Sequence, residues 1–249
     1  RNYFKDLIEI LDVQPEISVF YITSDAKDTE NISDNIKPIY IGSGFFRALL
    51  FSLIKCEMVI MTLTDLGNHE IKKSKYCENY VYIFHSLVST HKCYTQSAFK
   101  NYDIILSNGE YQKKELEYAE KIFNYKKKKI FNTGYLYLQE LQKNKKTMIN
   151  KNTILFAPSW NSSKNNLFDD YADKIIGKLL EKNQKTVLRT HPETLIRSNK
   201  NLKIIKEKYS SNKNFRLNTD LRNLEFLNES SILITDNGGM ALEYLIIQR

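Results

Sequence analysis

Short, almost unbroken apolar runs recur along this chain, and patterns typical of helices lie between them. Apolar runs without alternation predict strands that are covered on both faces, as in parallel sheets. Strands that alternate with helices are typical of βαβ units. We therefore predict strands at residues 17–23, 37–42, 58–63, 80–85, 102–108, 128–134, 153–160, 185–191, 214–219 and 231–236, and helices at 45–55, 110–123, 167–182, 194–209, 221–227 and from 240 onward.

A polar stretch rich in Lys and Asn, residues 141–152, interrupts this rhythm and predicts a linker. We expect an α/β fold of two Rossmann-like domains that face a cleft, one over residues 1–143 and one over residues 152–249. A length of 249 residues suits two domains. The chain lacks an initiator Met and ends in an apolar helical pattern, so we expect a fragment whose C-terminal part is truncated.

The formal net charge is +8, from 37 basic and 29 acidic residues. Such a charge suits nucleic acid, an anionic membrane surface or a polyanionic substrate. The densest basic run, residues 125–130, has no nucleic-acid-binding module around it, so we expect no nucleic-acid partner and interpret the run as a solvated turn. The sequence shows no membrane-spanning segment and no signal peptide, and we expect a cytoplasmic protein.

The three cysteines, Cys56, Cys77 and Cys93, lack the spacing of a metal site. We interpret them as reduced thiols, and we expect no metal ion.

Polar side chains follow four of the predicted strands, in both predicted domains. Ligands of open parallel sheets bind at the carboxyl ends of the strands. Four such endings predict a binding cleft. Their residues are His85 and Ser86 after the first of these strands, Ser159, Trp160 and Asn161 after the second, Arg189, His191 and Glu193 after the third, and Asp236, Asn237, Gly238 and Gly239 after the fourth.

The chemistry of these endings suits a phosphorylated ligand. Arg189 and His191 lie two residues apart, which places a fixed charge and an imidazole on one face of an extended strand. The glycines at 238 and 239 precede a helix and let an anion approach its backbone N–H groups. These features predict a site for a diphosphate or another anion at the strand ends.

Structural interpretations compete with these assignments. His85 fits a buried core histidine as well as a catalytic one, and His91 fits an exposed or helix-capping residue better than a catalytic one. The turn at residues 236–239 also fits an ordinary connection between a strand and a helix. Trp160 suits a core position or a stacking surface equally.

Five segments carry a resemblance to a known family. They are FHS at 84–86, FNTGY at 131–135, ILFAPSW at 154–160, VLRTHPE at 187–193 and ILITDNGGMALEY at 232–244. In this order they resemble the CDP-glycerol glycerophosphotransferases, which include teichoic-acid and capsule polymerases. The resemblance implies a GT-B architecture and an enzyme that transfers glycerol phosphate, or a similar polyol phosphate, from a CDP-linked donor to a hydroxyl group. The acceptor would be a surface polymer or lipid-linked, CMP would be released, and no cofactor is implied.

The resemblance also implies roles for single residues. His85 matches the proposed general base, and His191 matches the histidine of an R-x-H-P motif that contacts the donor phosphates. Residues 236–239 match a TD-x-S-S turn that holds the donor pyrophosphate. With this resemblance we also assign Ser159 and Arg189 to the binding of the nucleotide-linked donor. Because the family's polymers are assembled at the cytoplasmic face, we expect peripheral attachment at the inner face of the cell membrane, with anionic lipid as a partner.

Two departures keep alternatives open. The family continues its first histidine with GTPLK, whereas residues 86–90 here read SLVST, and two glycines replace the serines of the pyrophosphate turn. The segment TDNGGMALE also resembles UDP-N-acetylglucosamine 2-epimerases, in which a glutamate holds the ribose, and this makes Glu243 a ribose ligand. The alternatives are therefore a UDP-sugar glycosyltransferase, an epimerase-like enzyme or a non-catalytic fragment.

Overall fold

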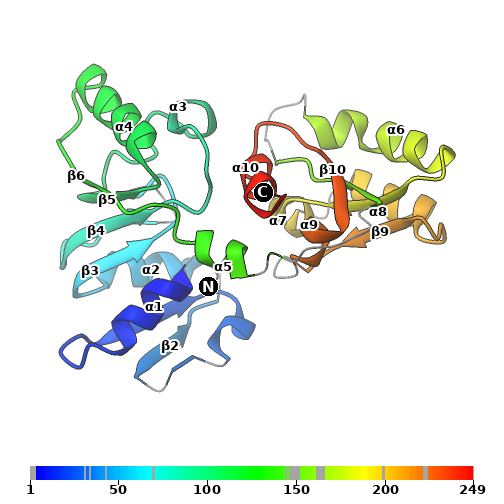
Figure 1. The fold of residues 1–249 in the computed structure, drawn as a ribbon. Helices are drawn as coiled ribbons and strands as arrows, with labels where there is room; N and C mark the ends of the chain where they lie inside the picture. Colours follow the sequence, from blue (N-terminus) through cyan, green and yellow to red (C-terminus); the bar gives the residue numbers. More distant parts are fainter. Residues whose placement is uncertain are drawn as a thin grey trace. The chain divides into compact units, whose positions relative to one another are not determined.

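The computed structural model of the protein describes residues 4–30, 32–33, 35–42, 44–68, 71–143, 145, 152–160, 166–197, 200–220 and 224–248. The chain forms two compact units, unit 1 (Arg1–Tyr137) and unit 2 (Leu138–Arg249) (Figure 1). All strand pairs that the described residues form in either unit are parallel, as predicted.

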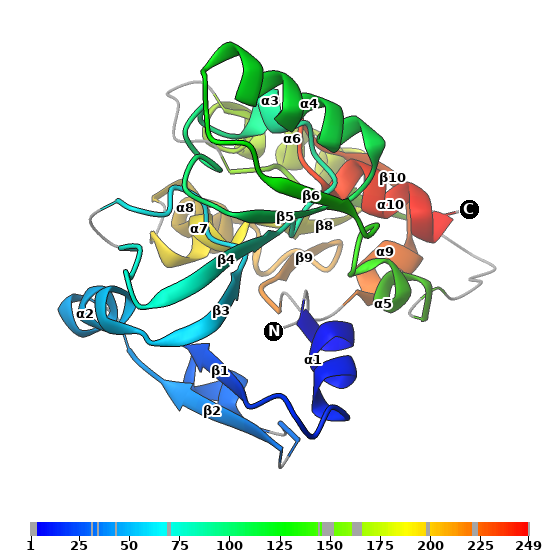
Figure 2. The ribbon, with the colours of Figure 1, turned by 90° about the vertical axis from the view of Figure 1, so that its left-hand side faces the viewer.

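Unit 1 contains two parallel sheets (Figure 2). Its elements are α1 (Lys5–Asp12), β1 (Val19–Thr23), η2 (Ala26–Thr29), β2 (Ile36–Tyr40), α2 (Phe45–Leu53), β3 (Cys56–Met61), β4 (Cys77–Ile83), α3 (Thr90–Cys93), β5 (Ile104–Ser107), α4 (Glu110–Ile122) and β6 (Lys129–Asn132). One sheet pairs β1 with β2, and the other has the strand order β3-β4-β5-β6. The carboxyl ends of β3 to β6 therefore share one edge.

Aromatic side chains build the core of the larger sheet of unit 1. Tyr80, Tyr82 and Phe84 are buried, and their spacing of two places them on one face of the chain. The ring of Tyr82 lies 4.9 Å from that of Phe84 and 4.8 Å from that of Phe99, both in edge-on orientation. Such aromatic pairs add to the stabilisation from burial, so β4 is anchored where the chain leaves it toward His85.

Unit 2 contains a single four-stranded sheet among its described residues (Figure 1). Its elements are α5 (Leu138–Lys143), β7 (Thr153–Phe156), α6 (Leu167–Glu181), β8 (Lys185–Arg189), α7 (Pro192–Ile196), α8 (Lys200–Tyr209), β9 (Phe215–Asn218), α9 (Glu225–Glu229), β10 (Ser230–Ile234) and α10 (Met240–Gln248). The strand order is β10-β7-β8-β9. The chain moves from β7 outward to β9 and then returns to the other side of β7, so the order reverses between β7 and β10.

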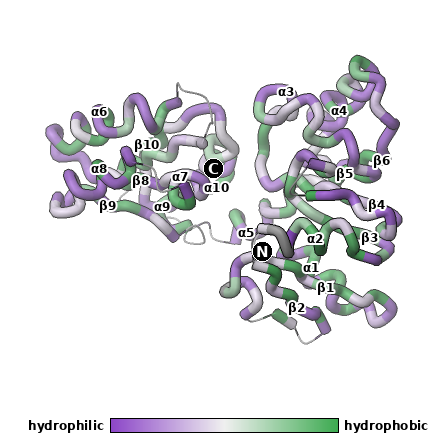
Figure 3. Tube along the Cα trace, turned by 180° about the vertical axis from the view of Figure 1, so that it is seen from behind, coloured by the Kyte–Doolittle hydropathy of each residue, from purple (hydrophilic) through white to green (hydrophobic). Residues whose placement is uncertain are grey.

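Helix α6 shows why the predicted helices cover the sheets. Asn166 caps it by accepting the N–H of Asp169 at 2.8 Å. Its buried residues recur every four positions, at Phe168, Ala172, Ile176 and Leu180, so one stripe faces the core. Figure 3 shows the matching alternation of hydrophobic and hydrophilic residues along α4 and α6.

The structure differs from the predicted elements in several places. The helix predicted at 194–209 is α7 followed by α8, and α7 begins earlier because His191 caps it and Pro192 fits the first helical turn. The predicted linker begins with α5, while residues 144 and 146–151 lie outside the described part of the chain. Residues 221–223, which begin the helix predicted at 221–227, also lie outside the described part of the chain. Helix α9 begins at Glu225. The sequence reading missed α1 and α3.

Candidate functional site

The carboxyl ends of β7 and β10 lie where the strand order of unit 2 reverses. This switch point is where open α/β sheets bind ligands. Backbone and side-chain bonds join the two strand ends here. Ala157 N–H donates to Ile234 O at 2.9 Å, Thr235 Oγ1 donates to Ala157 O at 2.6 Å, and the Ser159 N–H donates to Asp236 Oδ1 at 2.8 Å. Two of the predicted site residues, Ser159 and Asp236, are thus in direct contact.

Gly238 allows the turn at residues 236–239 to approach Ser159 closely. A Cβ atom at Gly238 would lie 3.1 Å from Ser159 Cβ, which is tighter than an ordinary van der Waals contact. Gly239 O accepts the N–H groups of Leu242 and Glu243, each at 3.1 Å, so the turn leads directly into α10. Glu243 is buried in the first turn of that helix. The turn therefore places the N-terminus of α10 at the switch point, a geometry that favours anions.

Arg189 is the last residue of β8, whereas His191 lies beyond the strand that was predicted to hold both, and the two side chains contact different residues. His191 is exposed, caps α7 by accepting the Glu193 N–H on Nδ1 at 3.2 Å, and stacks on Trp160 with ring centroids 6.4 Å apart. The guanidinium of Arg189 lies 4.3 Å from the ring centroid of Phe226. Trp160, for which the sequence left core and stacking roles open, is a stacking residue. Asn161, predicted at the same strand end, lies outside the described residues.

Two polar atoms near these residues lack partners within the described ranges. Thr190 is only 1% exposed, and neither its Oγ1 nor Asn218 Oδ1 has a hydrogen-bond partner there. Asn218 pairs in register with Arg189, so both atoms lie at the carboxyl edge of β8 and β9. Buried polar atoms usually have a hydrogen-bond partner, so this edge holds polar groups that the described residues leave unsatisfied.

In unit 1, His85 follows β4 at the corresponding edge of its own sheet. Tyr135, from the FNTGY segment, donates its hydroxyl hydrogen to His85 O at 3.3 Å. Burial lowers the pKa of His85 below the ordinary value of 6.5, and a hydrogen bond with the backbone of Thr62 acts in the opposite direction. A histidine held neutral in this way is able to accept a proton at neutral pH.

Helix α4 holds the loop that follows His85. Asn108 Nδ2 donates to Ser86 O at 2.9 Å, and Gln112 Nε2 donates to Val88 O at 3.0 Å. The Gln112 side chain is fully buried, and its Oε1 accepts the N–H of Asn108 at 2.8 Å. These two residues were not singled out from the sequence, because Asn108 ends a predicted strand and Gln112 lies in the helix that follows, so no helical spacing links them.

Glu115 extends the same face of α4 and binds the hydroxyl-rich end of the loop. It accepts hydrogen bonds from Ser89 Oγ at 2.8 Å and from Thr90 N and Oγ1, both at 2.6 Å. Burial raises the pKa of Glu115, but these bonds outweigh it and hold the pKa below its usual range. His91 is exposed and lies edge-on to Tyr118, so its interpretation as an exposed residue is confirmed. The hydroxyls of Ser89 and Thr90 therefore have a structural role.

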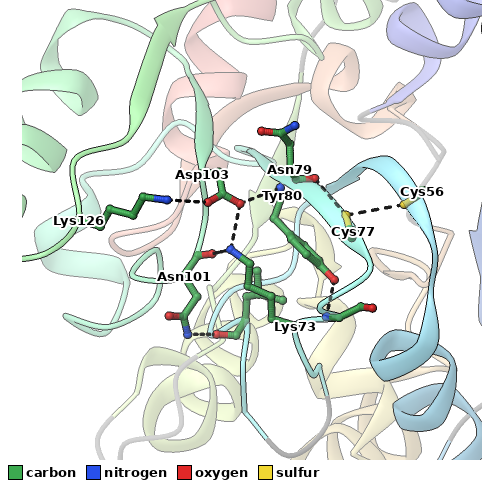
Figure 4. A network of polar contacts seen from close by, with 10 residues as sticks. Cys56, Lys73, Cys77, Asn79, Tyr80, Asn101, Asp103 and Lys126 are labelled. Atoms are coloured by element: carbon green, nitrogen blue, oxygen red, sulfur yellow. Dashed lines mark hydrogen bonds and ion pairs between the residues drawn. The ribbon is translucent and has the colours of Figure 1, made fainter.

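A second polar network of unit 1 lies at the opposite ends of the strands (Figure 4). Asp103, just before β5, accepts bonds from Lys73 Nζ at 2.9 Å, from Lys126 Nζ at 3.5 Å and from the N–H of Tyr80 at 3.1 Å. Burial raises the pKa of Asp103, but the two lysines and the Tyr80 amide together hold it below the usual range. Because ligands bind at carboxyl ends, we interpret this network as a structural tie between strand starts.

The described ranges contain no cluster of His, Cys, Asp or Glu side chains suited to a metal ion. Nor does any described helix have the length and apolarity needed to cross a membrane.

Comparison with known families identifies the fold and the family. The sequence model of the CDP-Glycerol:Poly(glycerophosphate) glycerophosphotransferases matches residues 63–249. The chain belongs to this family. Among curated proteins, no sequence matches it.

Solved structures of a wall teichoic acid polymerase and of an epimerase share the fold. The wall teichoic acid polymerase TagF is similar with a TM-score of 0.56 at 17% identity, over 99% of this chain and 64% of TagF. A TagF structure soaked with CDPG gives a TM-score of 0.57 at 16% identity, over 99% of this chain and 64% of that one. The UDP-GlcNAc 2-epimerase from Methanocaldococcus jannaschii gives 0.54 at 16% identity, over 99% and 78%. The predicted GT-B-like α/β fold is confirmed, and this chain spans about 64% of the length of TagF.

Proposed function

We propose that this chain carries out a CDP-glycerol glycerophosphotransferase reaction. The donor is CDP-glycerol or a similar CDP-linked polyol, the acceptor is a hydroxyl of a surface polymer such as a teichoic acid or capsule chain, and CMP leaves. Family membership supports the reaction class. The contact of Ser159 with Asp236 beside the N-terminus of α10, at the switch point of unit 2, is the observation that carries the donor site.

In this proposal unit 2 binds the donor. The turn at residues 236–239 and His191 hold the two phosphates, Arg189 adds positive charge at the same edge, and Glu243 binds the ribose. Fixed N–H donors and Arg189 stabilise the charge that develops on the departing CMP. Such electrostatic stabilisation is the main form of catalysis in phosphoryl transfer.

Unit 1 supplies the base and the acceptor site. The acceptor oxygen attacks the phosphorus that carries glycerol, the bond from that phosphorus to the CMP oxygen breaks, and the hydroxyl proton passes to His85. The burial that lowers the pKa of His85 keeps its imidazole neutral and ready for this role. The loop at residues 86–90, which departs from the family sequence, contributes to acceptor choice.

We further propose that the protein is cytoplasmic and binds the inner face of the membrane peripherally. The net charge of +8 supports attraction to anionic lipid. Salt screens exposed charges over about 10 Å at 0.1 M. Cosedimentation with anionic vesicles should therefore fall as salt rises, and binding that ignores salt would contradict this part of the proposal.

A thermal-shift panel of CDP-glycerol, CDP-ribitol, CDP, CMP, UDP and UDP-N-acetylglucosamine tests the donor. We expect cytidine diphosphates to raise the melting temperature more than the uridine compounds do. Gly238→Val should remove the shift, because its side chain meets Ser159 where the phosphates bind. A larger shift with UDP-N-acetylglucosamine would favour the epimerase-like alternative.

A further inference from the structure

Trp160 and His191 belong to a closed ring of contacts that the donor site above does not explain. The rings of Trp160 and His191 stack at 29°. The guanidinium of Arg197 lies 5.0 Å from the centroid of the Trp160 ring, and Arg197 Nε donates to Glu193 Oε2 at 2.9 Å. The ring closes at the backbone of Glu193, whose N–H binds His191 Nδ1.

This ring of contacts fixes which nitrogen of His191 faces outward. Because Nδ1 accepts a hydrogen bond, the proton of the neutral imidazole lies on Nε2. Stacking on Trp160 limits rotation of the imidazole plane, and the guanidinium of Arg197 against the Trp160 ring limits movement of the indole. His191 is exposed, so its Nε2–H is an oriented donor on the surface.

We propose that Trp160, held by Arg197 and Glu193, is a positioning residue that sets the His191 Nε2–H toward the donor phosphate. The inference rests on the proposed donor site. It gives a role to the final tryptophan of ILFAPSW and to the glutamate of VLRTHPE, which contact the histidine from two different strand ends. A neutral imidazole whose N–H is oriented in this way donates a hydrogen bond to phosphate without taking up a second proton.

The first experiment reads the imidazole without any ligand. Histidine labelled with ¹⁵N in the full chain is observed at pH 8, and the His191 signals are assigned by their loss in His191→Gln. We expect Nδ1 to be the unprotonated nitrogen and Nε2 the protonated one. Trp160→Phe should preserve this pattern, whereas Trp160→Leu should give an averaged mixture of tautomers. A His191 protonated on Nδ1 in the wild type would overturn the inference.

The second experiment measures the affinity for CDP-glycerol by calorimetry. Trp160→Leu should weaken binding about tenfold, because misplacing a binding group by a short distance is costly. Trp160→Phe should retain most of the affinity, and Arg197→Gln should lose about two- to fivefold. Tyr118→Leu is the matched control, since it removes the aromatic partner of His91 in unit 1 and should leave affinity unchanged.

The outcomes separate this inference from the proposed function. Wild-type affinity in a folded Trp160→Leu variant would overturn the positioning role. If Trp160→Leu does not fold, wild-type affinity together with an unchanged His191 signal in Arg197→Gln would overturn the role of this ring of contacts. If the wild type binds none of the nucleotides, the proposed function fails, and the tautomer measurement still decides whether the contacts orient His191.

Discussion

The two units hold their histidines in different ways. His85 of unit 1 is partly buried, and hydrogen bonds to backbone carbonyls fix its segment: Tyr135 donates to the His85 carbonyl, and Asn108 donates to the next one. His191 of unit 2 is exposed, and contacts to its ring fix it, from the Glu193 N–H and from Trp160. The first arrangement controls the charge of the imidazole, and the second controls its direction.

This difference suits the two tasks proposed for these histidines, general base for His85 and phosphate ligand for His191. A general base has to be neutral before the reaction, and burial achieves this by disfavouring the imidazolium. A phosphate ligand has to present a donor at one point, and an exposed ring with one nitrogen occupied achieves this without burial. The comparison therefore predicts that changes in unit 1 affect rate and that changes in unit 2 affect donor binding.

The strongest test of the comparison replaces each histidine. His85→Ala should lower turnover by about 100- to 10,000-fold, the usual effect of losing a general base, and leave donor affinity close to that of the wild type. His191→Ala should weaken donor binding and turnover together, because it acts on both ground state and leaving group. CMP release and donor calorimetry measure the two effects. CMP release at the wild-type rate in His85→Ala would show that the base is elsewhere.

The pH profile of kcat/KM tests the charge of His85. The neutral base is the active form, and burial lowers its pKa, so activity should be retained as pH falls through 6.5 and be lost only below that value. Below the lowered pKa the rate should fall about tenfold per pH unit, since the fraction of neutral imidazole falls by that factor. An acid limb with its midpoint above 6.5 would contradict the assignment.

The next test removes the Gln112 side chain, which holds the loop after His85 in unit 1. Gln112→Leu keeps a buried side chain of similar size but leaves Val88 O and the Asn108 N–H without partners. Each buried group left unsatisfied costs about 1–3 kcal/mol, so the free energy of unfolding should fall by that order. Chemical denaturation measures it. Lys178→Gln is the control, because its ion pair with Glu181 is exposed and should change stability very little.

The strands could be predicted from the sequence because their apolar runs are short and unbroken. The polar residues that follow each strand could then be located from these runs. The sequence also assigned Ser159 and Asp236 to one binding site, but their direct contact depends on β10 lying next to β7, a strand order that the sequence did not predict. It did not show that Glu115 binds the loop hydroxyls or that Arg197 lies on Trp160. Those contacts join side chains from separate elements, and neither periodicity nor spacing specifies such pairs.

The smallest expected effect concerns the turn at the switch point of unit 2. Gly238→Ala places a Cβ 3.1 Å from Ser159 Cβ, so the turn has to move by a few tenths of an ångström. Such overpacking costs about 1 kcal/mol of stability, and it should weaken donor binding while His85 continues to act as base. Combining Gly238→Ala with Ser159→Gly removes the crowded atom but keeps the N–H that binds Asp236, so donor affinity should recover. Denaturation and calorimetry of the single and double variants measure this. If the double variant binds donor as weakly as Gly238→Ala, the close approach of these two residues is not what shapes the site.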